Sequence, residues 1–312
     1  MIEQLTQNNR LQSKSGAPGR LEPRNFILHE SARAHHWSGR GLLSIKSFSG
    51  GRALYNTGGG YRAVDDTCYL ILNDGQDYSI TVDSASKVES FCVFFEPGLV
   101  EDVYRTCLES ESRLLDEPSL DYRPISFFDR TYPHDGVLSS TLSLIRISHR
   151  AQSGRPGWLQ EHLRLLAGKL LKVQCEAMKE TSALASVRAS TREELYRRLH
   201  RARDYVEALF DSPLTLNDIA RAACLSPSHL LRTFRQAFGC TPHQYLTRIR
   251  IQRARRLLTE TELSITSVCL SVGFESLGSF SALFRRSVGL SPEKYRLQNG
   301  DFREARTRLH RL

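Results

Sequence analysis

Long apolar segments are absent from this sequence. No stretch approaches the roughly 18 consecutive apolar residues that a membrane-spanning helix needs. The first residues, MIEQLTQNNRLQ, also lack the basic and then apolar pattern of a secretory signal peptide. These absences argue against an integral membrane protein and against secretion, so we expect a cytoplasmic protein with no membrane partner.

Paired cysteines are missing as well. The seven cysteines are an odd number, and none forms a C-x-x-C pair of the kind that indicates a zinc or redox site. We expect reduced and mostly buried thiols, with no metal and no cofactor. A redox-sensing cysteine needs a lowered thiolate pKa, which a sequence does not show, so that role stays open. The cysteines are Cys68, Cys92, Cys107, Cys175, Cys224, Cys240 and Cys269.

Lysine is nearly absent from the basic part of the chain. The net charge of +9 lies wholly in residues 191–312, which carry 21 Lys and Arg against 12 Asp and Glu. Twenty of these 21 basic residues are arginine, whose planar guanidinium group suits phosphate and guanine. The distribution favours a polyanionic partner for the C-terminal part.

Length and local composition indicate two domains and an α+β fold. A chain of 312 residues exceeds one domain of roughly 100–200 residues. Short runs rich in β-branched and aromatic residues, separated by turn signals, predict a small antiparallel barrel or sandwich, and helical spacing begins after Pro97-Gly98. The predicted strand runs are Leu42–Phe48, Tyr69–Leu72, Tyr78–Val82 and Ser90–Phe95. The predicted parts are a flexible arm (1–25), a strand-rich domain that ends in helices (26–180), a linker (181–192), a helical domain (193–298) and a basic tail (299–312).

One predicted helix, from Trp158 to Met178, has an a/d pattern that fits two interpretations. The apolar stripe could pair with a second copy of the chain in a homodimer, or it could pack on the protein's own sheet. Three heptads are too few to choose between them. The stripe consists of Leu159, Leu163, Leu166, Leu170, Val173 and Ala177.

An internal repeat dominates the C-terminal part. Unit one (Leu214–Tyr245) and unit two (Leu263–Tyr295) match at an offset of 49 residues that becomes 50 after a one-residue insertion. Each unit has a short helix, a tight connection and a second helix that ends at a glycine, which is the helix-turn-helix order. The matching pairs are Leu214 with Leu263, Leu216 with Ile265, Ile219 with Val268, Leu225 with Phe274, Leu230 with Phe280, Phe234 with Phe284, Gly239 with Gly289, Pro242 with Pro292 and Tyr245 with Tyr295.

The second helix of unit one has two distinct faces. Leu230, Phe234 and Phe238 form an inward stripe, which leaves Ser228, Arg232 and Arg235 on the opposite face. In helix-turn-helix motifs the N-terminal residues of this helix approach base edges in the major groove.

The two units are joined by a predicted helix from Pro242 to about Thr259. Its length of roughly 27 Å suits two recognition helices about one DNA turn, or roughly 34 Å, apart. Arg250 falls within its apolar arc, which predicts a structural ion pair with Asp218 as candidate partner. The other arginines, Arg248, Arg253, Arg255 and Arg256, are expected to be solvated and to contact phosphate at most.

Residues 196–296 resemble the AraC family of transcription regulators. The likeness rests on LTLNDIARAACLSPSHLLRTFRQAFGCTPHQYL, the joining RIRIQRARRLL and ITSVCLSVGFESLGSFSALFRRSVGLSPEKYR. The resemblance implies base-facing positions at Ser228, Leu231 and Arg232 in unit one and at Leu277, Gly278 and Ala282 in unit two. Ala282 departs from the family's frequent polar or basic residue, so unit one is expected to supply most hydrogen-bond specificity. The predicted DNA-binding set is Ser228, His229, Leu231, Arg232, Arg235, Leu277, Gly278, Ser279, Ser281, Ala282, Arg285 and Arg286.

The resemblance also implies a function for the whole chain. The N-terminal part looks like the cupin-like effector domain that many AraC-type regulators carry. A sequence-specific, ligand-responsive regulator would bind promoter DNA, an unknown small-molecule effector and RNA polymerase. The resemblance further implies that the protein is an activator and a homodimer with a cupin-like effector and dimerisation domain at 26–180 and a DNA-binding domain at 193–298. No residue pattern identifies the effector, the operator, the target genes or the sign of regulation.

The sequence argues against three rival classes, and we expect that the protein is not an enzyme. A metal-dependent cupin enzyme needs clustered ligands, whereas the adjacent His35 and His36 would point to opposite faces of a strand. A DNA-repair alkyltransferase needs clustered cysteine ligands, which are missing. A nonspecific nucleoid-type binder would have the basic charge without an ordered N-terminal domain. Metal analysis, and the ratio of specific to nonspecific affinity at a stated salt concentration, would discriminate between these classes.

Overall fold

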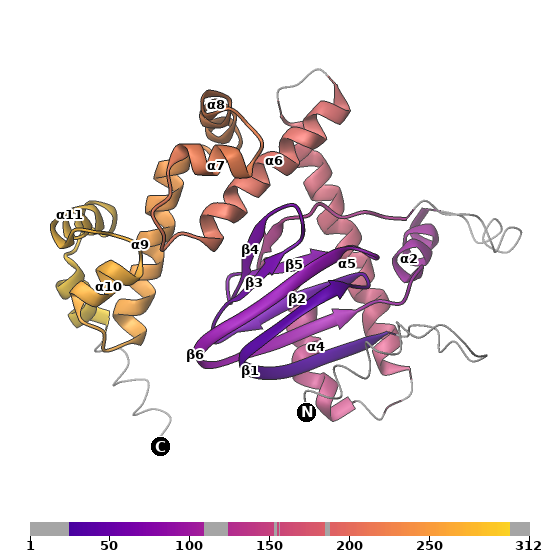
Figure 1. Cartoon of the computed structure of the whole chain (residues 1–312). Helices are drawn as coiled ribbons and strands as arrows, with labels where there is room; N and C mark the ends of the chain where they lie inside the picture. The colour runs from indigo at the N-terminus through magenta and orange to yellow at the C-terminus, as the bar shows by residue number, and fades with distance from the viewer. Residues whose placement is uncertain (1–24, 109–123, 153–154, 156, 185–187, 300–312) are drawn as a thin grey trace, which may run out of the picture.

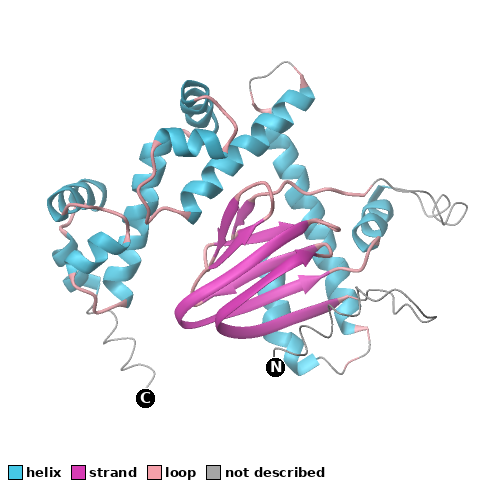
Figure 2. Ribbon diagram, viewed as in Figure 1, coloured by secondary structure: helices cyan, strands magenta, loops and turns pink. Residues whose placement is uncertain are grey.

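The computed structural model describes residues 25–108, 124–152, 155, 157–184 and 188–299. Figure 1 and Figure 2 show a strongly curved sheet with helices on one side and an all-helical domain beyond it. This arrangement confirms the α+β prediction, with a nearly closed barrel-like sheet followed by helix-turn-helix units. The predicted flexible arm, apart from Asn25, and residues 300–312 of the predicted tail lie outside the described residues.

The sheet is antiparallel, and its strand order is β4-β3-β6-β2-β5-β7, with β1 paired to β6. One long strand, β6, therefore pairs with β1, β2 and β3 and holds the barrel together. The strands are β1 (Phe26–Arg40), β2 (Ser44–Ser49), β3 (Ala53–Asn56), β4 (Tyr61–Val64), β5 (Cys68–Leu72), β6 (Asp77–Phe94) and β7 (Thr131–Pro133).

The strand predictions were correct in place but incomplete. The runs Leu42–Phe48 and Tyr69–Leu72 coincide with β2 and β5, whereas Tyr78–Val82 and Ser90–Phe95 belong mainly to the single strand β6. Sequence reasoning missed β1 because none of its side chains is fully buried, so it lacks a strong apolar run. Its His35 and His36 pair with Val82 and Thr81 of β6.

The a/d stripe of the predicted helix at 158–178 is part of the protein's own core. It lies on α5 (Trp158–Ser182), where Leu163, Leu166, Leu170 and Val173 are buried against the sheet and Leu159 packs at the edge of the same cluster. Of the two interpretations, the structure favours packing on the protein's own sheet, because Leu163, Leu166 and Leu170 are fully buried within the chain. The helices α2 (Leu99–Leu108) and α4 (Ser139–Gln152) supply further residues to this core.

The C-terminal domain contains both predicted helix-turn-helix units. Its first helix begins at Ala189, and α5 of the N-terminal domain continues to Ser182. Both helices therefore extend into the segment 181–192 that composition indicated as a linker. A single apolar cluster runs through both units and the helix that joins them. The helices are α6 (Ala189–Ala208), α7 (Leu216–Ala222), α8 (Pro227–Phe238), α9 (Pro242–Glu260), α10 (Ile265–Ser271) and α11 (Leu277–Val288).

The sequence repeat is also a geometric repeat. The rings of Phe234 and Tyr245 lie 5.7 Å apart at 73°, and those of Phe284 and Tyr295 lie 5.5 Å apart at 72°. The turn of each unit contains a left-handed residue, at φ 52° in Cys224 and φ 84° in Gly273. Both units therefore reproduce the same core contact and the same backbone turn.

All seven thiols are free, and four are buried: Cys68, Cys92, Cys240 and Cys269. Burial raises the pKa of the Cys68 thiol to about 12. None of the described helices has both the length and the apolar character needed to cross a membrane.

Candidate nucleic-acid interface

The outer face of α8 presents the residues predicted for unit one. The helix starts at Pro227, and the hydroxyl of Ser226 caps it by accepting a hydrogen bond from the backbone N–H of His229 at 3.4 Å. Ser228, Leu231, Arg232 and Arg235 are exposed, whereas His229 is half-buried. The buried side of the helix carries Leu230 and Phe234, as the apolar stripe predicts.

The two arginines of this face are unpaired. Neither Arg232 nor Arg235 makes a hydrogen bond or ion pair with the described part of the chain, so their guanidinium donors point to solvent. An arginine held on a rigid helix with free donors suits a bidentate contact to guanine or a phosphate contact.

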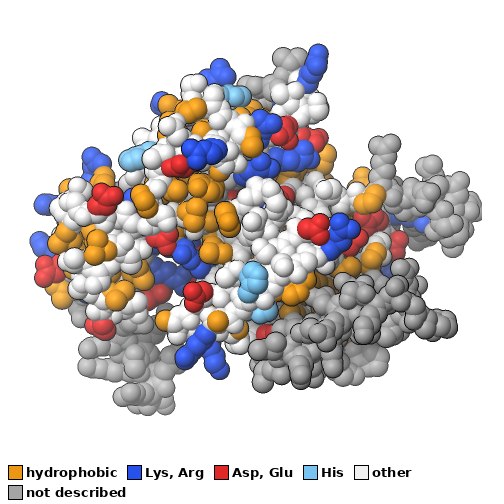
Figure 3. Space-filling model, viewed as in Figure 1, with side chains coloured by type: hydrophobic (Ala, Val, Ile, Leu, Met, Phe, Trp, Pro, Cys, Tyr) orange, Lys and Arg blue, Asp and Glu red, His pale blue; other side chains and the backbone are white. Residues whose placement is uncertain are grey.

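The matching face of α11 is more apolar. Leu277, Gly278, Ser279 and Ala282 are exposed, and Ser281 is half-buried. Arg285 and Arg286 are exposed near the C-terminal end of the helix and lack partners among the described residues. The cap is equivalent to that of α8, since the hydroxyl of Ser276 accepts a hydrogen bond from the N–H of Ser279 at 3.4 Å. In Figure 3, Lys and Arg side chains are spread over the visible face of the helical domain.

Arg250 has a structural role, but the predicted partner was wrong. Its Nε donates to the carbonyl of Phe210 and its Nη2 to the carbonyl of Ser212, both at 2.8 Å. Asp218 instead completes a capping box with Thr215 at the start of α7. The half-buried guanidinium therefore satisfies backbone carbonyls beyond the C-terminal end of α6 rather than pairing with a carboxylate.

Two of the arginines expected to be solvated bind the N-terminal domain. Arg253 pairs with Asp65 and Arg256 with Asp66, the latter at 2.7 Å. Both aspartates lie in the turn between β4 and β5, and Asp65 is buried. The prediction failed because the helical wheel shows the local face of α9 and not the domain packed against it. Arg248 is exposed and lies over the ring of Tyr245, and Arg255 donates to the hydroxyl of Tyr295.

Buried charges join α6 to the sheet. Asp204 of α6 is fully buried and accepts hydrogen bonds from the N–H and hydroxyl of Thr131 at 3.0 and 2.8 Å. Arg203 donates to Asp204 at 2.7 Å and to the carbonyl of Thr131 at 2.6 Å. Arg62 of β4 lies 3.5 Å from Asp204. Because each charge has a partner from the other domain, the two domains are held in a defined relative position.

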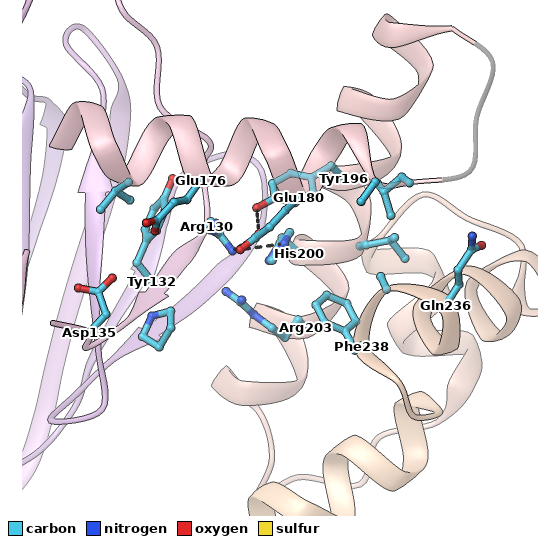
Figure 4. Close-up of a pocket in the computed structure, with 16 residues that line it drawn as sticks. Arg130, Tyr132, Asp135, Glu176, Glu180, Tyr196, His200, Arg203, Gln236 and Phe238 are labelled. Atoms are coloured by element: carbon cyan, nitrogen blue, oxygen red, sulfur yellow. Dashed lines mark hydrogen bonds and ion pairs between the residues drawn. The ribbon is translucent and has the colours of Figure 1, made fainter. Parts of the chain in front are cut away.

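A cavity opens beside this charged layer (Figure 4). Its volume is about 630 Å³, and its lining comes from β7 and the segments flanking it, α5, α6 and α8. Arg130, Tyr132 and Asp135 line it on the side of the sheet, and Gln236 and Phe238 line it at the end of α8. The cavity thus lies between the N-terminal domain and the recognition helix of unit one.

Comparison with known proteins addresses the helical domain. Residues 219–298 match the family described as Helix-turn-helix domain. The chain is 35% identical over 92 residues to the melibiose operon regulatory protein of Escherichia coli K12, a match that covers 30% of each chain. The C-terminal domain is an AraC-type DNA-binding domain. The curated relatives that match this domain are named as regulatory proteins.

Further matches extend over different lengths. The Msm operon regulatory protein of Streptococcus mutans is 28% identical over 177 residues, covering 55% of this chain and 60% of that protein. A solved transcription regulator from Chromobacterium violaceum, which has an AraC-type domain, is 35% identical with a TM-score of 0.32. The match covers 33% of this chain and 91% of that chain. The chain spans about a third of the length of the first curated relatives.

Sequence reasoning missed the cavity and the charged layer. The detectable signal was the spacing of Tyr196, His200, Arg203 and Asp204, which places polar residues on one face of α6. Neither their partner Thr131 nor the Asp65-Asp66 turn lies near this helix in the sequence. Among the described residues, no group of three or more His, Cys, Asp or Glu side chains is placed to hold a metal ion.

Proposed function

We propose that this chain is a sequence-specific transcription regulator of the AraC type that binds promoter DNA through α8 and α11. The observation that carries the proposal is the pair of equivalent helices with exposed outer faces. Four of the arginines on these faces are unpaired within the described part of the chain: Arg232, Arg235, Arg285 and Arg286. Basic side chains spread over both units support a long contact with the phosphate backbone.

In this proposal α8 and α11 make different contacts with DNA. Arg232 and Ser228 of α8 offer hydrogen-bond donors to base edges, and Leu231 offers an apolar contact beside them. On α11, the same outer positions hold Gly278 and Ala282, which suit contact with thymine methyl groups. Ser279, Ser281, Arg285 and Arg286 bind phosphate in this proposal, as Arg235 does on α8.

A small-molecule effector and RNA polymerase complete the proposed partners. The effector acts by binding two arrangements of the domains with different affinity, which is the thermodynamic requirement for any ligand-driven switch. Support comes from the charged layer between the domains, because it fixes one arrangement through contacts that a bound molecule could strengthen or weaken.

The test is selection of bound sequences from sheared genomic DNA at near-physiological salt, with the wild type and Arg232→Ala compared. We expect a few enriched sites in the wild type and a loss of about 1–3 kcal/mol of discrimination at one base pair in the variant. Arg285→Ala is expected to weaken all sites alike and to lower the salt slope by about 1.

Arg197→Ala is the matched control, because Arg197 is an exposed arginine of α6 that pairs with Glu193. It should leave both the enriched sites and the salt slope unchanged. Uniform recovery of DNA by the wild type would support nonspecific binding instead, and unchanged site preference in Arg232→Ala would remove this residue from base recognition.

A further inference from the structure

The interior of the barrel contains a lysine among its apolar side chains. Lys46 of β2 is 2% exposed. Its neighbour Ile45 points to the opposite face of the strand and joins the core beneath the helices, so Lys46 shares the inner face with Phe48 of the barrel cluster. Lysine is almost never fully buried unless it is paired, which makes the surroundings of this side chain informative.

The ammonium group of Lys46 is surrounded by aromatic rings rather than by acceptors. It makes neither a hydrogen bond nor an ion pair with the described part of the chain. Its Nζ lies 3.7 Å from the centroid of the Phe94 ring and 5.5 Å from that of Tyr78. Burial lowers the pKa of Lys46 to about 8, so roughly a quarter of the amine is neutral at pH 7.5. A neutral amine is a nucleophile.

A thiol lies directly across the strand pair. Lys46 and Cys92 are opposite each other in the register of β2 and β6, two strands that run side by side in Figure 1. Opposite residues of antiparallel strands point to the same face, with Cβ atoms about 4.5–5.5 Å apart. Cys92 is 4% exposed and belongs to the barrel cluster. Burial raises the pKa of its thiol and the charge of Lys46 opposes that shift, so the two groups interact.

The amine and the thiol suit condensation with an aldehyde better than oxidation. Oxidation of a thiol begins from the thiolate, which the burial of Cys92 disfavours. Condensation begins from the neutral amine, which the burial of Lys46 favours, and the thiol enters it in the protonated form. Cys68, another buried thiol of the cluster, lies opposite Pro133 of β7. Its cross-strand partner there therefore offers no amine.

The packing around Lys46 limits the size of a reacting molecule. On its other side, Lys46 lies opposite Leu70 of β5, which is fully buried. Tyr55, Leu72 and Val88 fill the same inner face. An aldehyde with one carbon brings no side group into this core, whereas a long or aromatic aldehyde would displace packed side chains.

We propose that Lys46 and Cys92 form a covalent capture site for a one-carbon aldehyde. The Lys46 nitrogen attacks the carbonyl carbon and forms a C–N bond, and the carbonyl oxygen leaves as water with one amine hydrogen and one proton from solvent. The Cys92 sulfur then attacks the iminium carbon and forms a C–S bond, and the thiol proton returns to solvent. The product is a methylene bridge, N–CH2–S, between β2 and β6, formed without an oxidant or a reductant. This site goes beyond DNA binding and does not depend on it.

The test exposes the full chain to a small molar excess of formaldehyde, removes the free aldehyde and locates the retained product by mass spectrometry. Adducts on single exposed lysines reverse when the aldehyde is removed, whereas the bridge is held by two covalent bonds. We expect one retained adduct per chain, with a mass gain of about 12 Da and a link between the peptides that contain Lys46 and Cys92. Benzaldehyde should leave no adduct at Lys46. Absence of the formaldehyde link between these two residues would overturn the proposal.

Substitutions assign the two bonds. Lys46→Met removes the amine but keeps an unbranched chain against Phe94, and Cys92→Ser removes the thiol, so both should abolish the bridge. The matched controls are Lys87→Met, at an exposed lysine of β6, and Cys68→Ser, at a buried thiol of the same cluster. Both controls should retain the bridge. A retained adduct of the same yield in Lys46→Met would place it elsewhere and overturn the assignment.

The unfolded wild-type chain tests the role of the fold without any substitution. Lys46 and Cys92 lie 46 positions apart in the sequence, and unfolding in sodium dodecyl sulfate removes both their register and the burial of the amine. The link between them should then lose its preference over links between other lysines and cysteines. Equal preference for this link in the folded and unfolded chains would overturn the proposal. DNA recognition is tested separately by Arg232→Ala.

Discussion

The two helix-turn-helix units share a backbone plan and differ in what they present and where they are anchored. Arg235 in α8 corresponds to Arg285 in α11, whereas Arg232 corresponds to Ala282. The ring contacts, the serine caps and the left-handed turn residues are repeated. The repeat therefore preserves the residues that fold the unit and changes one residue that would read a base.

The two units also differ in how they are joined to the N-terminal domain. Unit one packs on α6, whose Asp204 is buried against Thr131 of the sheet. Unit two packs at the far end of α9 (Figure 1), and its link to the sheet runs through Arg253 and Arg256 of that helix. A disturbance in the N-terminal domain should thus reach unit one through α6, and unit two through α9 and through Asp211, which pairs with Arg52 and lies against Gly273.

The largest expected loss of stability follows from a substitution at Asp204, which joins unit one to the sheet. Asp204→Asn leaves the buried Arg203 and Arg62 with less compensation, so the free energy of unfolding should fall by about 3–5 kcal/mol. Urea denaturation measures the change. Asp211→Asn is the control, because its pair with Arg52 at 2.9 Å is about one-third exposed and should contribute no more than about 1 kcal/mol. Equal losses in both variants would contradict the assignment of Asp204 as the anchor.

The next largest effects are changes in stability from substitutions at the left-handed turn residues. These changes should have opposite signs in the two units. A Cβ on Gly273 would lie 2.8 Å from the carbonyl oxygen of Asp211, and φ is positive there, so Gly273→Ala should destabilise the protein by about 1–3 kcal/mol. Cys224→Gly removes a side chain from the left-handed region of unit one and should stabilise it by up to about 1 kcal/mol. Thermal unfolding of both variants checks the signs, and a stabilising Gly273→Ala would contradict the shared turn geometry.

The buried His200, which lines the cavity beside unit one, should make the stability of the protein depend on pH. Since the folded-state pKa of His200 is lowered, the unfolded state takes up this proton first as the pH falls below about 6.5. The stability that the neutral ring contributes is therefore full above that pH and falls by up to about 1.4 kcal/mol per pH unit below it. His200→Gln should make the slope of stability against pH shallower by this amount between pH 6.5 and 5.

The pH prediction has its own control. His243→Gln, the same substitution at an exposed histidine of α9, should retain the slope of the wild type. Glu207 and Asp129 have raised pKa values caused mainly by burial, but they are present in every variant and cancel in the difference. Identical slopes in the wild type and His200→Gln would remove His200 from the acid response.

The smallest effect concerns the link to unit two. Asp66→Asn weakens a partly exposed pair with Arg256, which also pairs with Glu260, so the loss should not exceed about 1 kcal/mol. Hydrogen exchange should show faster opening in α9 and α10 with α7 unchanged. Faster exchange in α7 instead would mean that the two units are not anchored separately.

Short-range signals were enough to predict the helix-turn-helix units from the sequence. The inward ring of Phe234 follows from helical periodicity within the second helix of unit one, and the repeat places Phe284 at the matching position of unit two. For that reason, the predicted joining helix from Pro242 to about Thr259 matches α9 to within about one residue, and α8 and α11 end directly before the glycines predicted to end them. The exposed outer faces followed from the same periodicity, whereas their roles on DNA remain predictions.

What the sequence by itself determined is thus the helical domain, the barrel-like sheet in outline and the basic charge. Only the tertiary structure decided that the stripe at Leu163 and Leu166 is core, that Arg253 and Arg256 bind the Asp65-Asp66 turn, and that Arg130 and His200 line one cavity. The last two of these features join residues between 70 and 190 positions apart. Helical and strand periodicity constrains only neighbours along the chain, so the partner of a buried charge is fixed by how the domains pack.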